Sequence, residues 1–209
     1  RSVLKQIVDV AREHGLVVFS DEIYEKITYD GAEAINMATL TGDDVLCLTF
    51  SGLSKAYRVC GYRAGWVAIT GPKKDAASYL EGIHLLASMR LCSNVPAQHA
   101  IQTALGGYQS INELIVPGGR LYEQRTLAHK MLNEIDGISC TSADGALYLF
   151  PKIDVERFDI TDDEQFALDL LKSQKILFSH GRAFNWKDPD HFRLVFLPDT
   201  QTVSYTHLR

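Results

Sequence analysis

The sequence predicts an α/β protein, with a mostly parallel sheet covered by helices and then a smaller α/β domain. Two patterns carry this prediction. Residues 3–14 have helical spacing and stop at Gly15, and the apolar run 16–19 follows at once as a buried strand. After Gly137 the pattern changes to short strands around one acidic helix. Helices that alternate with buried strands are typical of layered α/β folds.

The remaining elements follow from the same patterns. Two further apolar runs, 45–50 and 66–70, predict buried strands of the same parallel kind. The stretch from Pro72 to Gly107 predicts helices, with Pro72 in a first helical turn. Beyond it the sequence predicts one or two helices over 110–136 and strands at 138–140, 146–150, 176–179 and 192–196. It also predicts a helix over 162–174 with an acidic cap at Asp162.

These elements divide the chain into four parts. We expect residues 1–110 to belong to the large domain, 111–136 to be connecting helices, and 137–202 to form the small C-terminal domain. Residues 203–209 continue no apolar face, so they are expected to be a disordered or non-native tail.

Composition excludes several classes of function. The chain has 209 residues, of which 46% are hydrophobic and 22% are charged, as is ordinary for a globular protein. It carries 21 Lys and Arg against 26 Asp and Glu, a net charge of −5, which makes it a poor general ligand for nucleic acid or anionic membranes. No apolar run approaches the ~18 residues of a membrane span. We therefore expect a cytoplasmic protein with no nucleic-acid or membrane partner.

The four cysteines are Cys47, Cys60, Cys92 and Cys140, and none has a CxxC partner. A metal knuckle is therefore not expected, and neither is any other metal site. Because Cys47 and Cys92 lie in apolar runs, the sequence predicts buried, reduced thiols in a cytosolic protein.

A lysine follows the second predicted strand closely, in the segment Ser51-Gly52-Leu53-Ser54-Lys55. Ligands bind at the carboxyl ends of strands in open α/β sheets, and small residues let a bulky cofactor approach the backbone. A partly desolvated amine is nucleophilic, so Lys55 is a candidate for Schiff-base formation. Taken alone, a solvated loop lysine is the competing interpretation.

Two other charged residues favour the functional interpretation of Lys55. Asp21, with Tyr24 nearby, follows the first predicted strand, where burying an acid is costly unless it pairs with a cation such as a protonated pyridine nitrogen. Arg63, shortly after Lys55, could bind a phosphate. An amine, an acid, a tyrosine and an arginine in these positions together fit pyridoxal phosphate.

These residues lie in three segments, Asp21-Glu22-Ile23-Tyr24, Ser51-Gly52-Leu53-Ser54-Lys55 and Gly61-Tyr62-Arg63-Ala64-Gly65-Trp66. The segments resemble the signature of fold-type I pyridoxal-phosphate aminotransferases of class I and II, most closely the bacterial glutamate–pyruvate (alanine) aminotransferases. Supporting segments are 89–98, 145–148 and Asp190-His191-Phe192-Arg193. The resemblance extends over about residues 1–199.

The resemblance implies a role for each residue that meets the cofactor. Lys55 would hold pyridoxal 5′-phosphate as an internal aldimine and later move the proton between the substrate Cα and the cofactor. Asp21 would pair with the pyridine nitrogen, and Tyr24 would hydrogen-bond the phenolic oxygen.

The resemblance also implies how the anionic groups are bound. Arg63, with either Ser51 or Ser54, would hold the cofactor phosphate. Arg193 would form a bidentate pair with the substrate α-carboxylate. Arg182 departs from the family pattern, because close relatives carry a small residue in this loop, which would face the substrate.

The resemblance implies that the chain is the C-terminal portion of an enzyme about twice its size. In family members the preceding half supplies the aromatic that stacks on the cofactor and part of the phosphate cradle. We therefore expect residues 1–209 to be inactive alone, and the complete enzyme to be a homodimer. An edge of the sheet at residues 16–19 would be left uncovered.

The implied activity is transamination of L-alanine and 2-oxoglutarate to pyruvate and L-glutamate. One alternative is a catalytically inactive, aminotransferase-like effector-sensing domain of a transcription regulator. Another is a scaffold with a dead site, but the joint presence of Asp21, Tyr24, Lys55, Arg63 and Arg193 argues against it, because a dead site has no need of that set.

Overall fold

The computed structural model describes residues 1–199, in two compact units. Unit 1 comprises Arg1–Lys26 and Glu33–Ile111, and unit 2 comprises Ile27–Ala32 and the chain from Asn112 onward. The division predicted from the sequence, with boundaries near residues 110 and 136, stays a prediction. The tail predicted at 203–209 lies outside the described residues.

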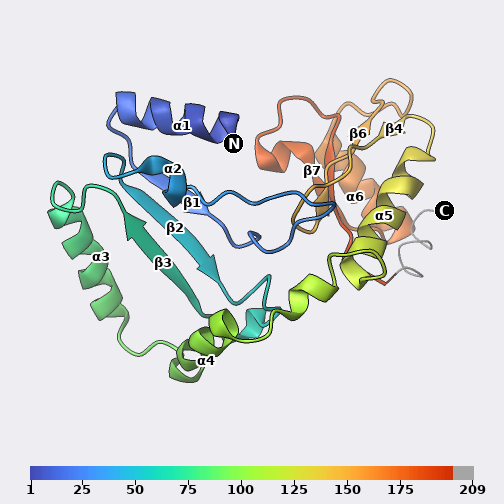
Figure 1. The fold of residues 1–209 in the computed structure, drawn as a ribbon. Coiled ribbons are helices and arrows are strands. Elements are labelled where there is room, and N and C mark those ends of the chain that lie inside the picture. The colour runs from blue at the N-terminus through green and yellow to red at the C-terminus, as the bar shows by residue number, and fades with distance from the viewer. Residues whose placement is uncertain (200–209) are drawn as a thin grey trace. The chain divides into compact units, whose positions relative to one another are not determined.

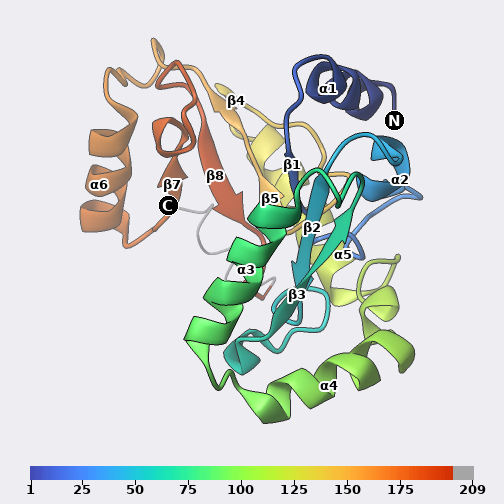
Figure 2. The same ribbon diagram turned by 90° about the vertical axis from the view of Figure 1, so that its left-hand side faces the viewer.

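Unit 1 contains a three-stranded sheet in the order β1-β2-β3 (Figure 1). Its strands are β1 (Val18–Asp21), β2 (Cys47–Gly52) and β3 (Gly65–Thr70). Its helices are α1 (Ser2–Glu13), α2 (Ala38–Thr41), α3 (Ala77–Arg90) and α4 (Val95–Gly106). Helices α1 and α4 lie at opposite ends of the sheet in both views (Figures 1 and 2).

The parallel arrangement predicted for the first two strands is confirmed. Strand β1 pairs with β2 in parallel, from Val18 beside Cys47 to Asp21 beside Phe50. The expectation for 66–70 is wrong in direction, because β3 is antiparallel to β2. A parallel return needs a crossover of a dozen or more residues, usually a helix, whereas the segment between β2 and β3 holds only the 3-10 turn Cys60–Tyr62.

The core of unit 1 forms between α1 and the buried start of β2. Val8 and Ala11 of α1 pack with Met37, Val45 and Cys47, and all five are buried. Burial of this α1 face against the strand accounts for the apolar helical spacing read from residues 3–14.

Three expectations for unit 1 are wrong in detail. The first strand begins at Val18 rather than Leu16, and Phe19 on it is 60% exposed, because within the described part of the chain it stands on an uncovered face of the sheet, where its ring stacks on the partly exposed ring of Phe50 with the centroids 5.8 Å apart. The helix expected from Pro72 begins at Ala77. Cys47 is buried as expected, but two other cysteines, Cys60 and Cys92, are exposed.

Up to residue 199, unit 2 has two small sheets and two α-helices. Strand β8 (Phe192–Val195) is the centre of one sheet, antiparallel to β5 (Tyr148–Leu149) and β7 (Ser179–His180). Strand β4 (Ile138–Ser139) pairs with β6 (Lys152–Ile153). The helices are α5 (Arg120–Asn133) and α6 (Asp163–Gln174). The acidic cap predicted for α6 is confirmed, since the Asp162 side chain accepts hydrogen bonds from Glu164 and Gln165.

Residues 27–32, here called the strap, are held in unit 2 by backbone and side-chain bonds that no local pattern predicts. The Tyr29 N–H donates to the Asp144 carbonyl at 2.9 Å, and the Ala146 N–H donates to the Ile27 carbonyl at 2.9 Å. Asp30 accepts a 2.6 Å bond from Arg125, whose side chain is 5% exposed and lies 4.6 Å from the Tyr29 ring centroid. The strap therefore neutralises a buried cation of unit 2.

Gly71, just after β3, provides a test of the packing of this sheet. It has φ +98°, and a Cβ there would lie 2.3 Å from the Val45 carbonyl oxygen, so we expect Gly71→Ala to lower the free energy of unfolding by about 2 kcal/mol. Gly82→Ala on α3 is the matched control. The added Cβ meets nothing within 4 Å there, so the free energy of unfolding should rise by up to about 1 kcal/mol. Urea unfolding followed by circular dichroism measures both. Equal effects would contradict the close approach at Gly71.

Candidate active site

The parallel pairing of β1 with β2 brings two segments predicted to be functional to the same edge of the sheet. Asp21 is the last residue of β1 and lies beside Phe50 of β2. Strand β2 then ends at Gly52, and Lys55 follows in the bend after it. The carboxyl ends of parallel strands meet at one edge, where α/β proteins bind ligands.

Five of the predicted site residues line one hollow of about 430 Å³ in unit 1. The structure thus brings together an amine, a carboxylate, a guanidinium and two hydroxyls that are separated by up to 42 positions in the sequence. The five residues are Asp21, Ser51, Ser54, Lys55 and Arg63. Lining the same hollow are Ile23, Phe50 and Cys60, for which the sequence patterns gave no functional signal.

Tyr24 lies beside Lys55 without lining that hollow. The Lys55 Nζ is 5.7 Å from the centroid of the Tyr24 ring. The Asp21 carboxylate accepts a 3.2 Å bond from the Ile23 N–H, which fixes the turn between the two residues. Tyr24, expected to bind the same cofactor as Lys55, therefore lies near that lysine.

The neighbouring acid, Glu22, has a structural role. Its carboxylate accepts hydrogen bonds from the Ser20 hydroxyl at 3.0 Å, from the Met37 N–H at 2.8 Å and from the Asn36 amide. These bonds tie the end of β1 to the start of α2. Of the two consecutive acids, only Asp21 lines the hollow with Lys55.

Arg63 is held in position by backbone geometry before β3. Its φ of +50° is unusual for a residue with a side chain, and its Nη1 donates a 2.7 Å bond to the Cys60 carbonyl. A Cβ on Gly65 would lie 2.7 Å from the Ser51 carbonyl oxygen, so only glycine allows β3 to pass this close to the serine segment.

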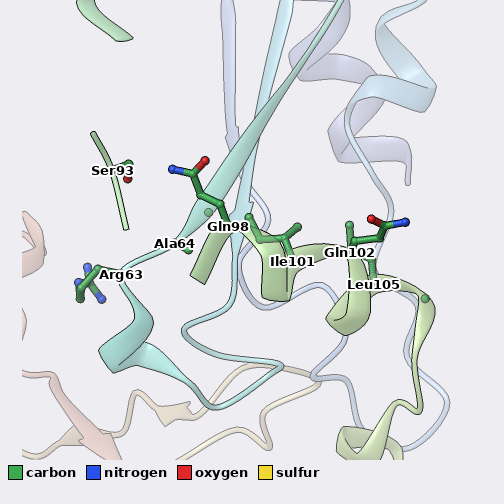
Figure 3. Close-up of a pocket in the computed structure, with 9 residues that line it drawn as sticks. Arg63, Ala64, Ser93, Gln98, Ile101, Gln102 and Leu105 are labelled. Carbon is green, nitrogen blue, oxygen red and sulfur yellow. The ribbon is translucent and has the colours of Figure 1, made fainter. Parts of the chain in front are cut away.

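A second hollow, of about 910 Å³, is also lined by Arg63 (Figure 3). Gln98, Ile101 and Gln102 line it from α4, and Ser93 lines it from the segment before that helix. Arg63 lines both hollows. Ser93 and Gln98 belong to the segment 89–98 that supports the resemblance, but no residue pattern predicts this second hollow.

Arg193, predicted to bind a carboxylate, lies on β8 in unit 2. Two aromatic rings flank its guanidinium, with the Cζ atom 4.6 Å from the centroid of Tyr148 and 4.3 Å from that of Phe184. Its Nε is buried and finds no hydrogen-bond partner within residues 1–199. A guanidinium with an unpaired buried donor is suited to a planar anion such as a carboxylate.

Arg182, the residue expected to depart from the family pattern, is bound by two carboxylates. Its Nε donates to Asp163 at 2.5 Å, its backbone N–H donates to the same carboxylate at 2.9 Å, and its Nη2 donates to Asp162 at 2.6 Å. Burial alone would raise the pKa of Asp163, but the hydrogen bonds and charge of Arg182, with His180 nearby, outweigh it and lower the pKa.

Two further findings concern the described part of the chain. Within residues 1–199, no cluster of three or more His, Cys, Asp or Glu side chains has a geometry that could hold a metal ion. No helix in the same range is both long and apolar enough to cross a membrane.

With this geometry in place, comparison with known proteins identifies the family. Residues 1–208 match the family aminotransferase class I and II, and the chain belongs to this family. The chain is 63% identical over 196 residues to the alanine aminotransferase of Mycobacterium tuberculosis H37Rv, a match that covers 94% of the chain and 46% of that relative. It is 59% identical over 203 residues to the glutamate-pyruvate aminotransferase AlaA of Escherichia coli K12, covering 97% of the chain and 50% of that relative.

A solved structure shows the same fold. The crystal structure of an aminotransferase from Escherichia coli superimposes with a TM-score of 0.97 at 56% identity, over 100% of this chain and 51% of that one. The expected fold class, that of the fold-type I aminotransferases, is confirmed by this likeness. The chain spans about half the length of the curated relatives it matches.

The donor set around Lys55 fits the cofactor that the family implies. Pyridoxal phosphate presents an aldehyde, a basic ring nitrogen and a phosphate. The first hollow offers an amine for the aldehyde, the Asp21 carboxylate for a protonated nitrogen, and Arg63 with two serine hydroxyls for the phosphate. One hollow therefore holds a partner for each of the three groups.

The ion pair of Asp163 with Arg182 predicts a dependence of stability on pH. The folded Asp163 carboxyl titrates below the unfolded value of about 3.9, so its stabilisation is complete above that pH and is lost as the pH falls through the lowered pKa. We expect Asp163→Asn to lower the free energy of unfolding by about 2 kcal/mol at pH 7, and by progressively less below pH 4. Urea unfolding across pH 2–7 measures this difference.

Asp169→Asn is the matched control, because Asp169 is exposed on the same helix. It should change the unfolding free energy little at any pH. A loss in Asp163→Asn that stays the same from pH 7 to pH 2 would contradict the ion pair as its cause.

Proposed function

We propose that this chain is part of a pyridoxal-phosphate-dependent aminotransferase that converts L-alanine and 2-oxoglutarate to pyruvate and L-glutamate. The observation that carries the proposal is the single hollow shared by Lys55, Asp21, Arg63 and two serines. The substrate pair is supported by the printed names of the relatives, alanine aminotransferase and glutamate-pyruvate aminotransferase.

Three side chains of this chain, those of Lys55, Asp21 and Tyr24, would each have a separate role toward the cofactor ring. Bound pyridoxal phosphate supplies an electron sink for the carbanion formed at the substrate Cα. Lys55 would hold the cofactor through Nζ and would move the proton at the substrate Cα as a general base and acid. Asp21 keeps the ring nitrogen protonated, because a carboxylate favours the charged form of a neighbouring base. Tyr24, beside Lys55, hydrogen-bonds the phenolic oxygen.

Two arginines would bind the anionic ends of the reactants. Arg63, with Ser51 or Ser54, holds the phosphate and so fixes the ring relative to Lys55. Arg193 holds the α-carboxylate that amino acid and oxo acid share. Because both reactants present the same carboxylate, one arginine serves both halves of the exchange.

Location and assembly belong to the same proposal. We place the complete enzyme in the cytoplasm as a homodimer, and we propose that residues 1–209 alone are inactive. Support for the last point is that this chain spans about half of its relatives. A regulator that senses an effector on the same fold would bind the cofactor without turnover, so amine exchange separates the two functions. No relative reported above is named as a regulator.

Lys55→Ala should abolish transamination. The test uses a chimera in which this chain replaces the matching half of the Escherichia coli AlaA enzyme, 59% identical to it. Without the Lys55 amine there is no covalent anchor and no proton carrier, so we expect the rate of alanine–2-oxoglutarate exchange to fall at least about a thousandfold. Borohydride reduction followed by mass spectrometry should attach the cofactor to Lys55 in the parent chimera and to no residue of the chain in the variant.

Lys73→Ala is the matched control, because Lys73 is an exposed lysine in a turn of the same unit. It should keep the parent rate and the labelled Lys55. Turnover by Lys55→Ala within tenfold of the parent would reject the assignment of Lys55.

Arg193→Leu should weaken the binding of both reactants. Removing a charged bidentate partner from a half-buried site costs about 2–5 kcal/mol, which is at least a thirtyfold rise in KM. We expect this rise for alanine and 2-oxoglutarate alike in the same chimera. A rise confined to one of the two would assign Arg193 to a side chain of that reactant rather than to the shared carboxylate.

A further inference from the structure

Asp163 is a buried charge that the proposed reaction does not use. The residue is 3% exposed at the start of α6, where a carboxylate is costly unless it is paired. Its partner is Arg182, in the 3-10 turn Gly181–Phe184. Both oxygens are engaged, one by the Arg182 side chain and the other by the Arg182 backbone N–H.

These bonds fix the beginning of the loop 181–186. Arg182 is bound through its backbone and its side chain, so the carboxylates of α6 orient the turn as well as neutralise the cation. Gly181 donates a 2.8 Å bond to the His191 carbonyl, and a Cβ on it would lie 2.6 Å from that oxygen. The guanidinium of Arg182, although 41% of the side chain is exposed, is consequently held against the start of α6.

The end of the loop 181–186 is fixed by a second acid. Trp186 Nε1 donates a 2.9 Å bond to the Asp190 carboxylate, and its backbone N–H donates to the Gly181 carbonyl at 3.3 Å. Asn185, with φ +59°, donates its N–H to the Arg182 carbonyl at 3.0 Å. The loop is therefore closed on itself and anchored at both ends.

Phe184 lies between these two anchors and contacts Arg193. Its ring centroid is 4.3 Å from the Arg193 Cζ, although the residue is 43% exposed. A half-exposed ring is held in place by its backbone more than by surrounding core, so the loop determines where the ring lies. The second flanking ring, Tyr148, comes from β5, which pairs with the same strand as Arg193.

We propose that Asp163 and Arg182 are positioning residues which, by holding Phe184 against Arg193, orient its guanidinium for the substrate α-carboxylate. The inference rests on the proposed function for the identity of that ligand. Rings that flank a guanidinium restrict its rotation and leave the N–H groups of its edge for an anion. Two parallel hydrogen bonds to a carboxylate require such a fixed plane, and a small tilt breaks one of them. On this view Arg182 does not touch substrate.

The first experiment measures the orientation of Arg193 directly. The 209-residue chain is labelled with 15N-arginine, and exchange of each Nε–H proton with water is followed by NMR, with Arg193→Lys assigning the Arg193 signal. Phe184→Leu and Asp163→Asn should each speed exchange at Arg193 at least fivefold and reduce the ring-current shift of its Nε–H.

Arg125 supplies an internal control within the same unit. Its Nε is also buried without a hydrogen-bond partner in the described residues, and its guanidinium also lies beside two rings, Tyr29 and Tyr122. Its exchange should stay within twofold in both variants, and Asp169→Asn should leave both arginines unchanged. Equal acceleration at Arg193 and Arg125, or none at Arg193, would overturn the proposal.

The second experiment is kinetic and uses the chimera with the Escherichia coli enzyme. Asp163→Asn and Arg182→Gln should raise KM for alanine and for 2-oxoglutarate about tenfold and leave kcat within twofold. The rate with ethylamine, which lacks a carboxylate, should not change, and Arg182→Lys should recover part of the loss. Equal loss with ethylamine would show a general structural role and overturn the proposal. If Arg193→Leu leaves the KM of both carboxylate substrates unchanged while the NMR result holds, the α-carboxylate is not the ligand of Arg193. The positioning of its guanidinium by Asp163 and Arg182 would still stand.

Discussion

The parallel pairing of β1 with β2 is the constraint on which the candidate active site depends. It sets Asp21 beside Phe50, so the acid after one strand and the lysine after the next reach the same edge of the sheet. Both strands direct their carboxyl ends there, and the ligand-binding groups therefore need no further element to meet. A slip of one residue would turn Asp21 to the opposite face and separate it from Lys55.

Much of this arrangement could be predicted from local pattern. The helical spacing of residues 3–14, the apolar runs before Asp21 and Lys55, and the acidic cap of α6 each depend on neighbours a few positions away. Lys55, Asp21 and Arg63 are candidates because charged side chains amid small residues, shortly after apolar runs, have few structural uses. The candidate roles of Tyr24, Arg193 and the two serines come from the family resemblance, and the roles of all these residues stay proposals.

The features that sequence could not predict depend on distant partners. Strands β2 and β3 both come from apolar runs, and β3 is antiparallel because the connection between them holds a 3-10 turn in place of a crossover helix. The exposure of Phe19 depends on whether another element packs on that face of β1, and the sequence of the strand does not encode this. From the sequence, Arg182 is expected in a loop that faces the substrate, but its guanidinium binds Asp163 and Asp162. No spacing rule could predict this, because the two acids lie about 20 positions away at the start of α6.

The strap has a consequence for how this polypeptide can be divided. Unit 2 is discontinuous, because Ile27–Ala32 belongs to it while the residues on either side belong to unit 1. A gene segment that encodes only the chain from Asn112 onward would lose Asp30 and leave Arg125 as a buried cation without its carboxylate. A single recombination crossover before Asn112 therefore preserves this ion pair only where the other parent supplies an equivalent of Asp30. Otherwise unit 2 must be inherited together with residues 27–32, which interrupt the sequence of unit 1.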